Sequence, residues 1–276
     1  MIEFAEYVVS ELNFLDPGVE KPQTFIYPPT SGKDPMRPKL DPHEVRIYDA
    51  RDIADTLSLD KQGFELMRHQ SRVENFYDDG QVEAVYYAET EALVKQVMGA
   101  TRVHMFDHTV RNNALADDSD NLIRRPVGQV HNDYTDKSGP QRVRDLLGDE
   151  AEELLQHRFA FINVWRPIKG PVLDQPLALC DAGSMAPDDL VETDLVYEDR
   201  VGNIHGVRFN PDQRWYYVRE MQPDEVMFLK CFDSETDGRA RFMAHTGFAN
   251  PESPPDAPPR ESIEARTIAF FAPQDS

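Results

Sequence analysis

The chain has 276 residues, of which 50 are acidic and 29 basic, giving a formal net charge of −21. A surface of this charge repels nucleic acid and anionic membranes at physiological salt, so neither is expected as a partner. The length suffices to bury a full hydrophobic core. No stretch approaches the roughly 18 apolar residues of a membrane span. The first residues carry acids and no basic segment, so we expect a cytoplasmic protein.

Two cysteines, Cys180 and Cys231, stand among apolar neighbours, and the sequence contains no Cys-x-x-Cys pair. Free cysteine is among the most buried residue types, so we interpret both as buried thiols in a reducing compartment. Structural zinc is therefore not expected. The oligomeric state is left open, with a homodimer as one alternative.

The N-terminal part of the chain contains a proline-rich stretch at residues 27–38. Proline at this density favours extended or turn conformations, so residues 1–44 are predicted to form an extended arm. Residues 45–276 are predicted to form one domain. Within it, residues 45–49 alternate like a strand and residues 51–62 carry local helix signals.

Helical spacing of apolar residues predicts a helix over 89–97, and a strand entering the core follows at 100–110. A second helix is predicted over 145–157. The remaining predicted strands are 127–134, 158–166, 176–181, 205–209, 215–221, 225–232, 242–248 and 262–271. Short strands separated by Pro, Gly and Asp turns indicate a mainly β fold with flanking helices, built on a double-sheet jelly roll or barrel.

His131 and Asp133 place two side chains that can bind a metal two residues apart. On a strand, residues i and i+2 point to the same face, so both can reach one ion. His245, in a strand-like segment far downstream, is the candidate third ligand. Two histidines and one carboxylate leave three coordination positions open, as in the facial triad of iron(II) oxygenases. Taken alone the spacing is a weak signal, and a hydrogen-bonded strand histidine is the alternative for His131.

The final predicted strand carries polar residues on one face, because they alternate with apolar ones: Arg260, Ser262, Glu264 and Arg266. A guanidinium beside a hydroxyl is what the far carboxylate of a dicarboxylate co-substrate requires. The alternative is that the two arginines pair with the acids nearby, Glu261 and Glu264.

Asn163 and Trp165 alternate on the predicted strand 158–166, which should line the barrel. Asn163 is a candidate to hydrogen-bond the co-substrate. Trp165 is a candidate wall of the pocket, with a core tryptophan as an equal alternative. Arg166 is expected on the opposite face. Lys230 follows an apolar run and is expected to face outward, with binding of a carboxylate as the alternative.

Taken in order, the motifs of the chain resemble the iron(II)/2-oxoglutarate-dependent oxygenases of natural-product pathways. That group includes the cephamycin 7α-hydroxylation component, the fungal gibberellin desaturase and the fungal endoperoxide-forming meroterpenoid oxygenase. The resemblance extends over most of the chain from about residue 45. Its carriers are YDAR (48–51), GF (63–64), YAE (87–89), GA (99–100), FDHTVR (106–111), HNDYT (131–135), NVWRP (163–167), PLALCD (176–181), FDS (232–234), HTGF (245–248) and PRESIEAR (259–266).

The resemblance implies a double-stranded β-helix core of cupin-like type, iron(II), 2-oxoglutarate as co-substrate and dioxygen. It implies hydroxylation, desaturation or related radical chemistry on a small, secondary-metabolite-like molecule. Arg260 and Ser262 would bind the far carboxylate of 2-oxoglutarate, and Arg266 would steady its other end. The candidates for the substrate pocket are Tyr134, Trp165, Arg111 and Phe248. The rival functions are a jelly-roll metal-binding protein without redox turnover and a cupin-type metal-dependent hydrolase or isomerase.

Overall fold

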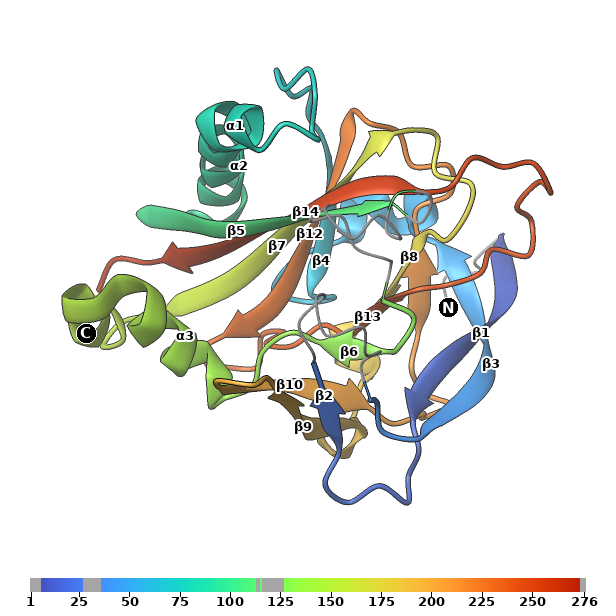
Figure 1. Ribbon diagram of the computed structural model, residues 1–276, viewed down its shortest axis with the longest axis horizontal. Coiled ribbons are helices and arrows are strands. Elements are labelled where there is room, and N and C mark those ends of the chain that lie inside the picture. Colours follow the sequence, from blue (N-terminus) through green and yellow to red (C-terminus); the bar gives the residue numbers. More distant parts are fainter. Residues whose placement is uncertain (1–5, 27–35, 113–114, 116–126, 274–276) are drawn as a thin grey trace.

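Two β-sheets form the body of the molecule (Figure 1). The structure is a computed structural model that describes residues 6–26, 36–112, 115 and 127–273. In sheet order, the larger sheet contains β1 (Tyr7–Leu15), β3 (Leu40–Asp49), β11 (Trp215–Tyr217), β8 (Leu177–Cys180), β13 (His245–Gly247), β6 (His131–Asn132), β10 (Val201–Val207), β9 (Leu190–Val196) and β2 (Gln23–Phe25). The smaller sheet contains β4 (Phe64–Arg68), β12 (Glu225–Asp233), β7 (Phe159–Lys169), β14 (Glu261–Phe270) and β5 (Arg102–Asn112). The prediction of a mainly β, double-sheet fold is confirmed.

Helices flank the smaller sheet. Figure 1 shows α1 (Asp79–Gln81) and α2 (Tyr87–Met98), joined by a π turn η3 (Val82–Tyr86), over its outer face. At its end lie α3 (Ser138–Leu147), the 3-10 turn η4 (Gly148–Glu150) and α4 (Ala151–Leu154). Further 3-10 turns are η2 (Ala50–Thr56), η5 (Ala182–Ser184) and η6 (Pro187–Asp189). Among the described residues, no helix is long and apolar enough to cross a membrane.

Two helix predictions differ from the structure. The helix predicted over 145–157 begins earlier, at Ser138, and is interrupted at Gly148, whose φ of +51° ends α3. A residue with this backbone angle cannot continue a right-handed helix. The helix signals of residues 51–62 produce only the 3-10 turn η2, which Asp49 caps by accepting from the backbone N–H of Arg51.

Three hydrophobic clusters hold the sheets and helices together. The first fills the space between the two sheets and includes Phe64, Phe161, Trp165, Leu179 and Leu229. The second lies between the smaller sheet and α2 and includes Leu93, Val94, Ile162, Phe228 and Ile263. The third packs on the larger sheet and includes Phe14, Ile47, Trp215, Tyr217 and Phe248. Each strand of the smaller sheet feeds two clusters, because successive side chains point to opposite faces.

The described part of the predicted N-terminal arm is extended, but it is paired and packed. β1 pairs with β3 along its whole length, from Tyr7 opposite Tyr48 to Leu15 opposite Leu40. Its alternate residues, Val8, Leu12 and Phe14 among them, are buried in the third cluster. Apolar residues at every second position are what a half-buried strand requires. The pairing therefore crosses the predicted boundary at residue 45.

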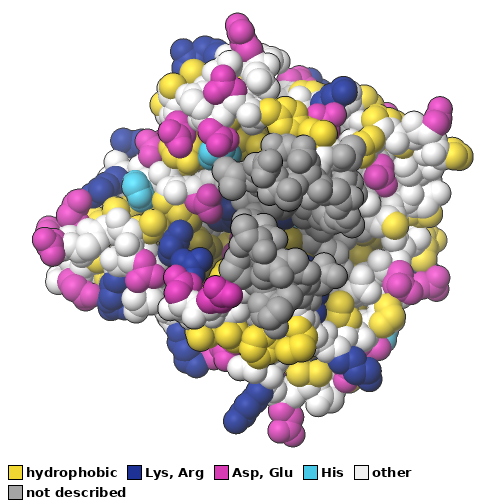
Figure 2. Space-filling model, in the orientation of Figure 1, with side chains coloured by type: hydrophobic (Ala, Val, Ile, Leu, Met, Phe, Trp, Pro, Cys, Tyr) yellow, Lys and Arg dark blue, Asp and Glu magenta, His cyan; other side chains and the backbone are white. Residues whose placement is uncertain are grey.

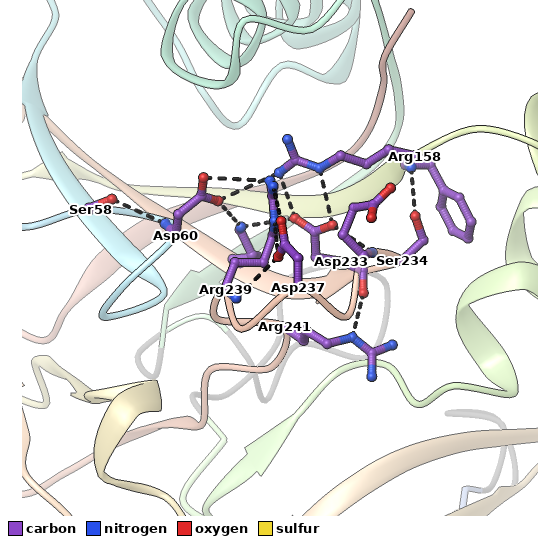
Figure 3. A network of polar contacts seen from close by, with 11 residues as sticks. Ser58, Asp60, Arg158, Asp233, Ser234, Asp237, Arg239 and Arg241 are labelled. Carbon is purple, nitrogen blue, oxygen red and sulfur yellow. Dashed lines mark hydrogen bonds and ion pairs between the residues drawn. The ribbon is translucent and has the colours of Figure 1, made fainter. Parts of the chain in front are cut away.

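Acidic side chains are spread around the face seen in Figure 2, in keeping with the net charge of −21. Figure 3 shows a network of charged side chains around Asp233, which is buried, and Asp60, which is exposed. Lys230 is 0% exposed, and its Nζ donates to Asp60 at 2.5 Å and to Asp233 at 2.9 Å. Arg158 also pairs with Asp233, at 2.7 Å. The expectation that Lys230 faces outward is wrong, because the segment at Asp60 covers this end of β12 and supplies a carboxylate.

Candidate metal centre

Three side chains that can bind a metal converge between the sheets. The ligand atoms of His131, Asp133 and His245 all lie within 4.8 Å of one another. His131 on β6 is directly opposite His245 on β13, and their ring centroids are 4.6 Å apart. Asp133 follows β6, and its Oδ1 lies 3.4 Å from His131 Nε2. His131 on β6, Asp133 just after it and His245 on the neighbouring strand thus form the three-ligand arrangement expected from their spacing.

Hydrogen bonds orient the two histidines. His131 Nδ1 lies 2.8 Å from the carbonyl of Gln129, and His245 Nδ1 lies 3.3 Å from the carbonyl of Met243. When each Nδ1–H donates to its carbonyl, Nε2 of each ring is left as the metal-binding nitrogen. Burial, together with the charge of His131, lowers the pKa of His245 and favours the neutral ring that a metal requires.

Asp133 is held in its charged form. Burial acts to raise its pKa, but when both histidines are protonated, the hydrogen bond from His131 and the positive charges of His245, His131 and Arg266 outweigh burial and hold the pKa well below the usual range. Its second oxygen, Oδ2, accepts from Asn163 Nδ2 at 2.6 Å. Two neutral imidazoles and one carboxylate suit a divalent iron with open positions, so the residues present fit the metal.

Asn163 and Glu264 form a second layer behind Asp133. Asn163 Nδ2 also donates to Glu264 Oε1 at 2.9 Å, so the protein uses both of its N–H groups. Its Oδ1 is buried and has no partner among the described residues. Sequence reasoning considered Glu264 only as a neighbour for the arginines and missed its place beside the ligand. The sequence feature that could have placed Glu264 near the centre was its position on the polar face of the predicted final strand, residues 260–266.

Arg260 is buried without a matching anion. It is 4% exposed, its Nη1 donates to the carbonyl of Gln175 at 2.5 Å, and its guanidinium carbon lies 5.6 Å from the centroid of the Trp165 ring. Its Nε and the hydroxyl of Ser262 are buried with no partner in the described part of the chain. Glu261, proposed as an alternative partner, is taken by Lys169 and Tyr77. Buried polar groups without partners are costly, and a bound carboxylate would satisfy them.

Arg266 is paired within the protein. Its Nη1 contacts Asp107 at 3.2 Å and Thr109 at 2.9 Å, and its Nη2 contacts Glu264 at 3.0 Å. The alternative of pairing with local acids therefore applies to Arg266 and not to Arg260. Arg111 approaches the same carboxylate, with its Nη2 3.6 Å from Glu264 Oε2.

A small apolar pocket adjoins both Arg260 and the strand that carries His245. Trp165, under the guanidinium, lines one part of it, and Leu179, directly opposite His245, lines another. The full lining is Trp165, Val172, Pro176, Leu177, Leu179, Val218, Met221 and Met227. Its lining therefore connects Trp165, which contacts Arg260, with Leu179, which stands opposite His245.

The remaining predicted pocket residues divide into two groups. Tyr134 is buried beside Asp133 and stacks on Phe161 with the ring centroids 4.0 Å apart, and burial raises its pKa. Phe248 packs edge-on against Tyr217 in the third cluster. The structure thus brings Tyr134, Trp165 and Arg111 around the centre, but not Phe248, which strand alternation turns to the other face from His245.

Comparisons with known proteins agree with this arrangement. A family model described as "Oxidoreductase/YMDC permease-like domain" matches residues 12–270. The chain is 35% identical to the Fe(II)/2-oxoglutarate-dependent dioxygenase nvfI of Aspergillus novofumigatus, over 98% of this chain and 99% of that protein. It is 34% identical to the hydroxylase/desaturase efuI of Hormonema carpetanum, over 87% of each.

A solved structure is also similar. The iron and α-ketoglutarate-dependent endoperoxidase NvfI superposes with a TM-score of 0.87 at 33% identity, over 97% of this chain and 99% of that chain. The likeness therefore extends over both sheets and includes the strands that carry His131 and His245. The chain belongs to the family of Fe(II)- and 2-oxoglutarate-dependent dioxygenases.

Proposed function

We propose that this dioxygenase oxidises a small, secondary-metabolite-like molecule, with its iron bound by His131, Asp133 and His245. The observation that carries the proposal is the convergence of three metal-binding side chains in a protein that also buries Arg260 and Ser262 with donors that have no partner among the described residues. The printed names of the relatives include a hydroxylase/desaturase and an endoperoxidase. Hydroxylation, desaturation or related radical chemistry is the proposed reaction.

The co-substrate is proposed to lie along the cavity. Arg260 and Ser262 would bind the far carboxylate of 2-oxoglutarate, because both have buried donors without partners. The apolar walls would contact its methylene groups. Arg266, whose contacts go to Asp107, Thr109 and Glu264, would contribute positive charge on the other side of the centre.

Iron(II), when bound, supplies the activation of dioxygen that accompanies oxidation of 2-oxoglutarate to succinate and carbon dioxide. The protein holds the metal-binding side chains in place. The two carbonyl contacts fix the histidine rings, and Asn163 fixes the second oxygen of Asp133. The buried walls around the cavity exclude water from the reaction.

The substrate is proposed to be an organic metabolite of low molecular weight. The ring of Tyr134, next to Asp133, packs against Phe161, which packs in turn against Phe106. Arg111 adds a polar group. Apolar sites with a few polar groups are typical of small-molecule pockets. The cupin-type hydrolase is disfavoured, because it has no use for the anion-free Arg260.

The proposed location is the cytoplasm, supported by two buried cysteines that are both free. A homodimer is the proposed assembly. The exposed Tyr7 and Val9 on the edge strand β1 offer it an apolar surface. Light scattering after size-exclusion chromatography measures the mass, and a monomer would contradict this assembly.

The test of function is an anaerobic titration with iron(II) and then 2-oxoglutarate. We expect a weak visible charge-transfer band from the wild-type protein, and no band from His131→Ala, Asp133→Ala or His245→Ala with circular dichroism unchanged. His157→Ala, at an exposed histidine, is the matched control and should keep the band. Succinate formation is then followed against pools of small molecules, peptides and oligonucleotides. Absence of the band in wild type, or stimulation by oligonucleotides alone, would overturn the proposal.

A further inference from the structure

We propose that Glu264 is a positioning residue that restricts Asp133 to binding iron through one oxygen, by fixing the amide of Asn163. The inference rests on the proposed function of the centre. It adds Glu264 to the residues to which that function assigns a role. It concerns how the three remaining positions on the metal are kept available for the co-substrate and dioxygen.

The two oxygens of Asp133 have different surroundings. Oδ1 lies 3.4 Å from His131 Nε2, on the side where the ligand atoms converge. Oδ2 lies 2.6 Å from Asn163 Nδ2 and is therefore engaged on the opposite side. This short hydrogen bond restrains Oδ2 against rotation of the carboxylate toward a metal.

Glu264 decides how the Asn163 amide is oriented. An amide NH2 has two hydrogens, and the second goes to Glu264 Oε1 at 2.9 Å. Rotation of the amide by half a turn would direct its carbonyl oxygen at two carboxylates and lose two charge-assisted hydrogen bonds. With Asn163 fully buried and Glu264 6% exposed, water cannot replace those bonds easily.

Glu264 is itself held from behind. Its Oε2 contacts Arg266 at 3.0 Å and Arg111 at 3.6 Å, and Arg266 is tied in turn to Asp107 and Thr109 on β5. A second buried carboxylate near Asp133 is electrostatically unfavourable by itself. The two arginines compensate for it, so the strands β5, β14 and β7 together hold one amide in one orientation.

Loss of Glu264 should have a specific signature. An Asn163 amide free to rotate would release Oδ2, and Asp133 could then occupy a position that the co-substrate needs. Iron binding should persist, while 2-oxoglutarate binding should weaken. The charge change alone acts in the other direction, since removing an anion should strengthen binding of a dianion. Weaker 2-oxoglutarate binding would therefore show that Glu264 acts by positioning Asn163 and not through its own charge.

The experiment compares Glu264→Ala with Glu261→Ala, an acid on the same strand that pairs with Lys169 and Tyr77 away from the centre. Anaerobic titrations measure iron(II) affinity first and then the charge-transfer band against 2-oxoglutarate. For Glu264→Ala we expect an iron dissociation constant within about threefold of wild type and a 2-oxoglutarate constant raised about tenfold or more, equivalent to roughly 1.4 kcal/mol. Glu261→Ala should match wild type in both.

Unchanged 2-oxoglutarate affinity in Glu264→Ala would overturn the inference, as would a parallel loss of iron binding, co-substrate binding and thermal stability. Should the alanine variant not fold, Glu264→Leu carries the test, because it fills similar space but cannot accept from Asn163; we expect the same weakening of 2-oxoglutarate binding, and unchanged affinity would again overturn the inference. Glu264→Gln, whose carbonyl can still accept from Asn163, should restore most of the affinity, and a loss as large as that of the leucine variant would count against positioning. A wild-type protein without the band would refute the proposed function instead, so the two failures are separable.

Discussion

Two buried arginines of the chain are satisfied in different ways. Arg166, which the sequence predicts on the face away from the site, is almost fully buried. It donates to the carbonyls of His69 and Pro223. The rings of Phe76 and Tyr86 lie within cation–π distance of it. Arg260 has only one carbonyl and one ring, and Nε of both arginines is buried without a partner among the described residues. Burial lowers the pKa of Arg260 to about 9, so it remains charged at neutral pH at a cost in stability.

This cost leads to a prediction for Arg260→Met. The methionine fills similar space without a charge, so the melting temperature of the ligand-free protein should be unchanged or higher. Binding of 2-oxoglutarate should weaken about tenfold to a hundredfold, because a charge-assisted hydrogen bond is worth roughly 1.5–3 kcal/mol. Thermal melting with and without 2-oxoglutarate, in the presence of iron(II) and without oxygen, measures both effects.

Arg266→Met is the matched control. It leaves Asp107 and Glu264 without their partner, so the ligand-free protein should melt at a lower temperature. If instead Arg266→Met lost more co-substrate affinity than Arg260→Met, the roles assigned to the two arginines would have to be exchanged.

At the scale of elements, the metal ligands lie on very short strands held between longer ones. β6 has two residues, and it pairs with β13 on one side and β10 on the other. Opposite His131 on β10 stands Gly206, where an added Cβ would lie 2.8 Å from Thr193 Oγ1. A larger residue would push β10 away from β9 and disturb the strand next to the ligand.

His205, beside Gly206, makes the stability of this region depend on pH. Its ring is 7% exposed and packs edge-on against Phe242, and burial lowers its pKa to about 4 from 6.5. The unfolded chain binds a proton below about 6.5, while the folded ring stays neutral down to about 4. Because the unfolded state holds more protons between these values, stability falls as the pH falls from 6.5 to 4.

We therefore predict that His205→Gln loses less stability than wild type between pH 7.5 and pH 4.5. The difference should reach about 2.5 kcal/mol, from roughly 1.36 kcal/mol per pKa unit. Urea unfolding of the metal-free protein at both pH values measures it, and comparing the two changes removes any constant cost of the substitution. Equal pH dependence in the two proteins would show that His205 is not the titrating group.

The sequence allows the long buried strands β7, β12 and β14 to be predicted from their marked apolar runs, and β5 from the alternation of its residues. It does not allow β9 to be predicted, because the segment LVETDLV is largely half-exposed and mixes charges with apolar residues. The spacing of His131 and Asp133, together with the motifs around His245 and the final strand, allows the candidate centre to be predicted. The link from Asn163 to Glu264 depends on the register of β7 and β14, with its irregularity at Glu261, which local sequence does not encode.

For the whole molecule, the net charge of −21 contrasts with the cations around the centre. Arg111, Arg260 and Arg266 lie at or near the site, while acids dominate the surface as a whole. 2-Oxoglutarate is a dianion, so the molecule as a whole repels it and the interior attracts it. The repulsion by the surface acids acts over a longer distance than the attraction by the buried arginines. Added salt therefore weakens the repulsion more than the attraction.

Salt should therefore accelerate binding of 2-oxoglutarate to the iron-loaded protein. The Debye length falls from about 30 Å at 0.01 M to about 8 Å at 0.15 M ionic strength, so added salt screens the distant acids. Buried Arg260 acts within a few ångströms of its ligand and is screened much less. We expect the association rate, followed by growth of the charge-transfer band in an anaerobic stopped-flow experiment, to rise about twofold or more over this range. Dissociation, set by the buried contacts, should change little, and sucrose at equal osmolarity should have no comparable effect. A rate that falls with salt would mean that the arginines at the site, rather than the net charge, control the approach.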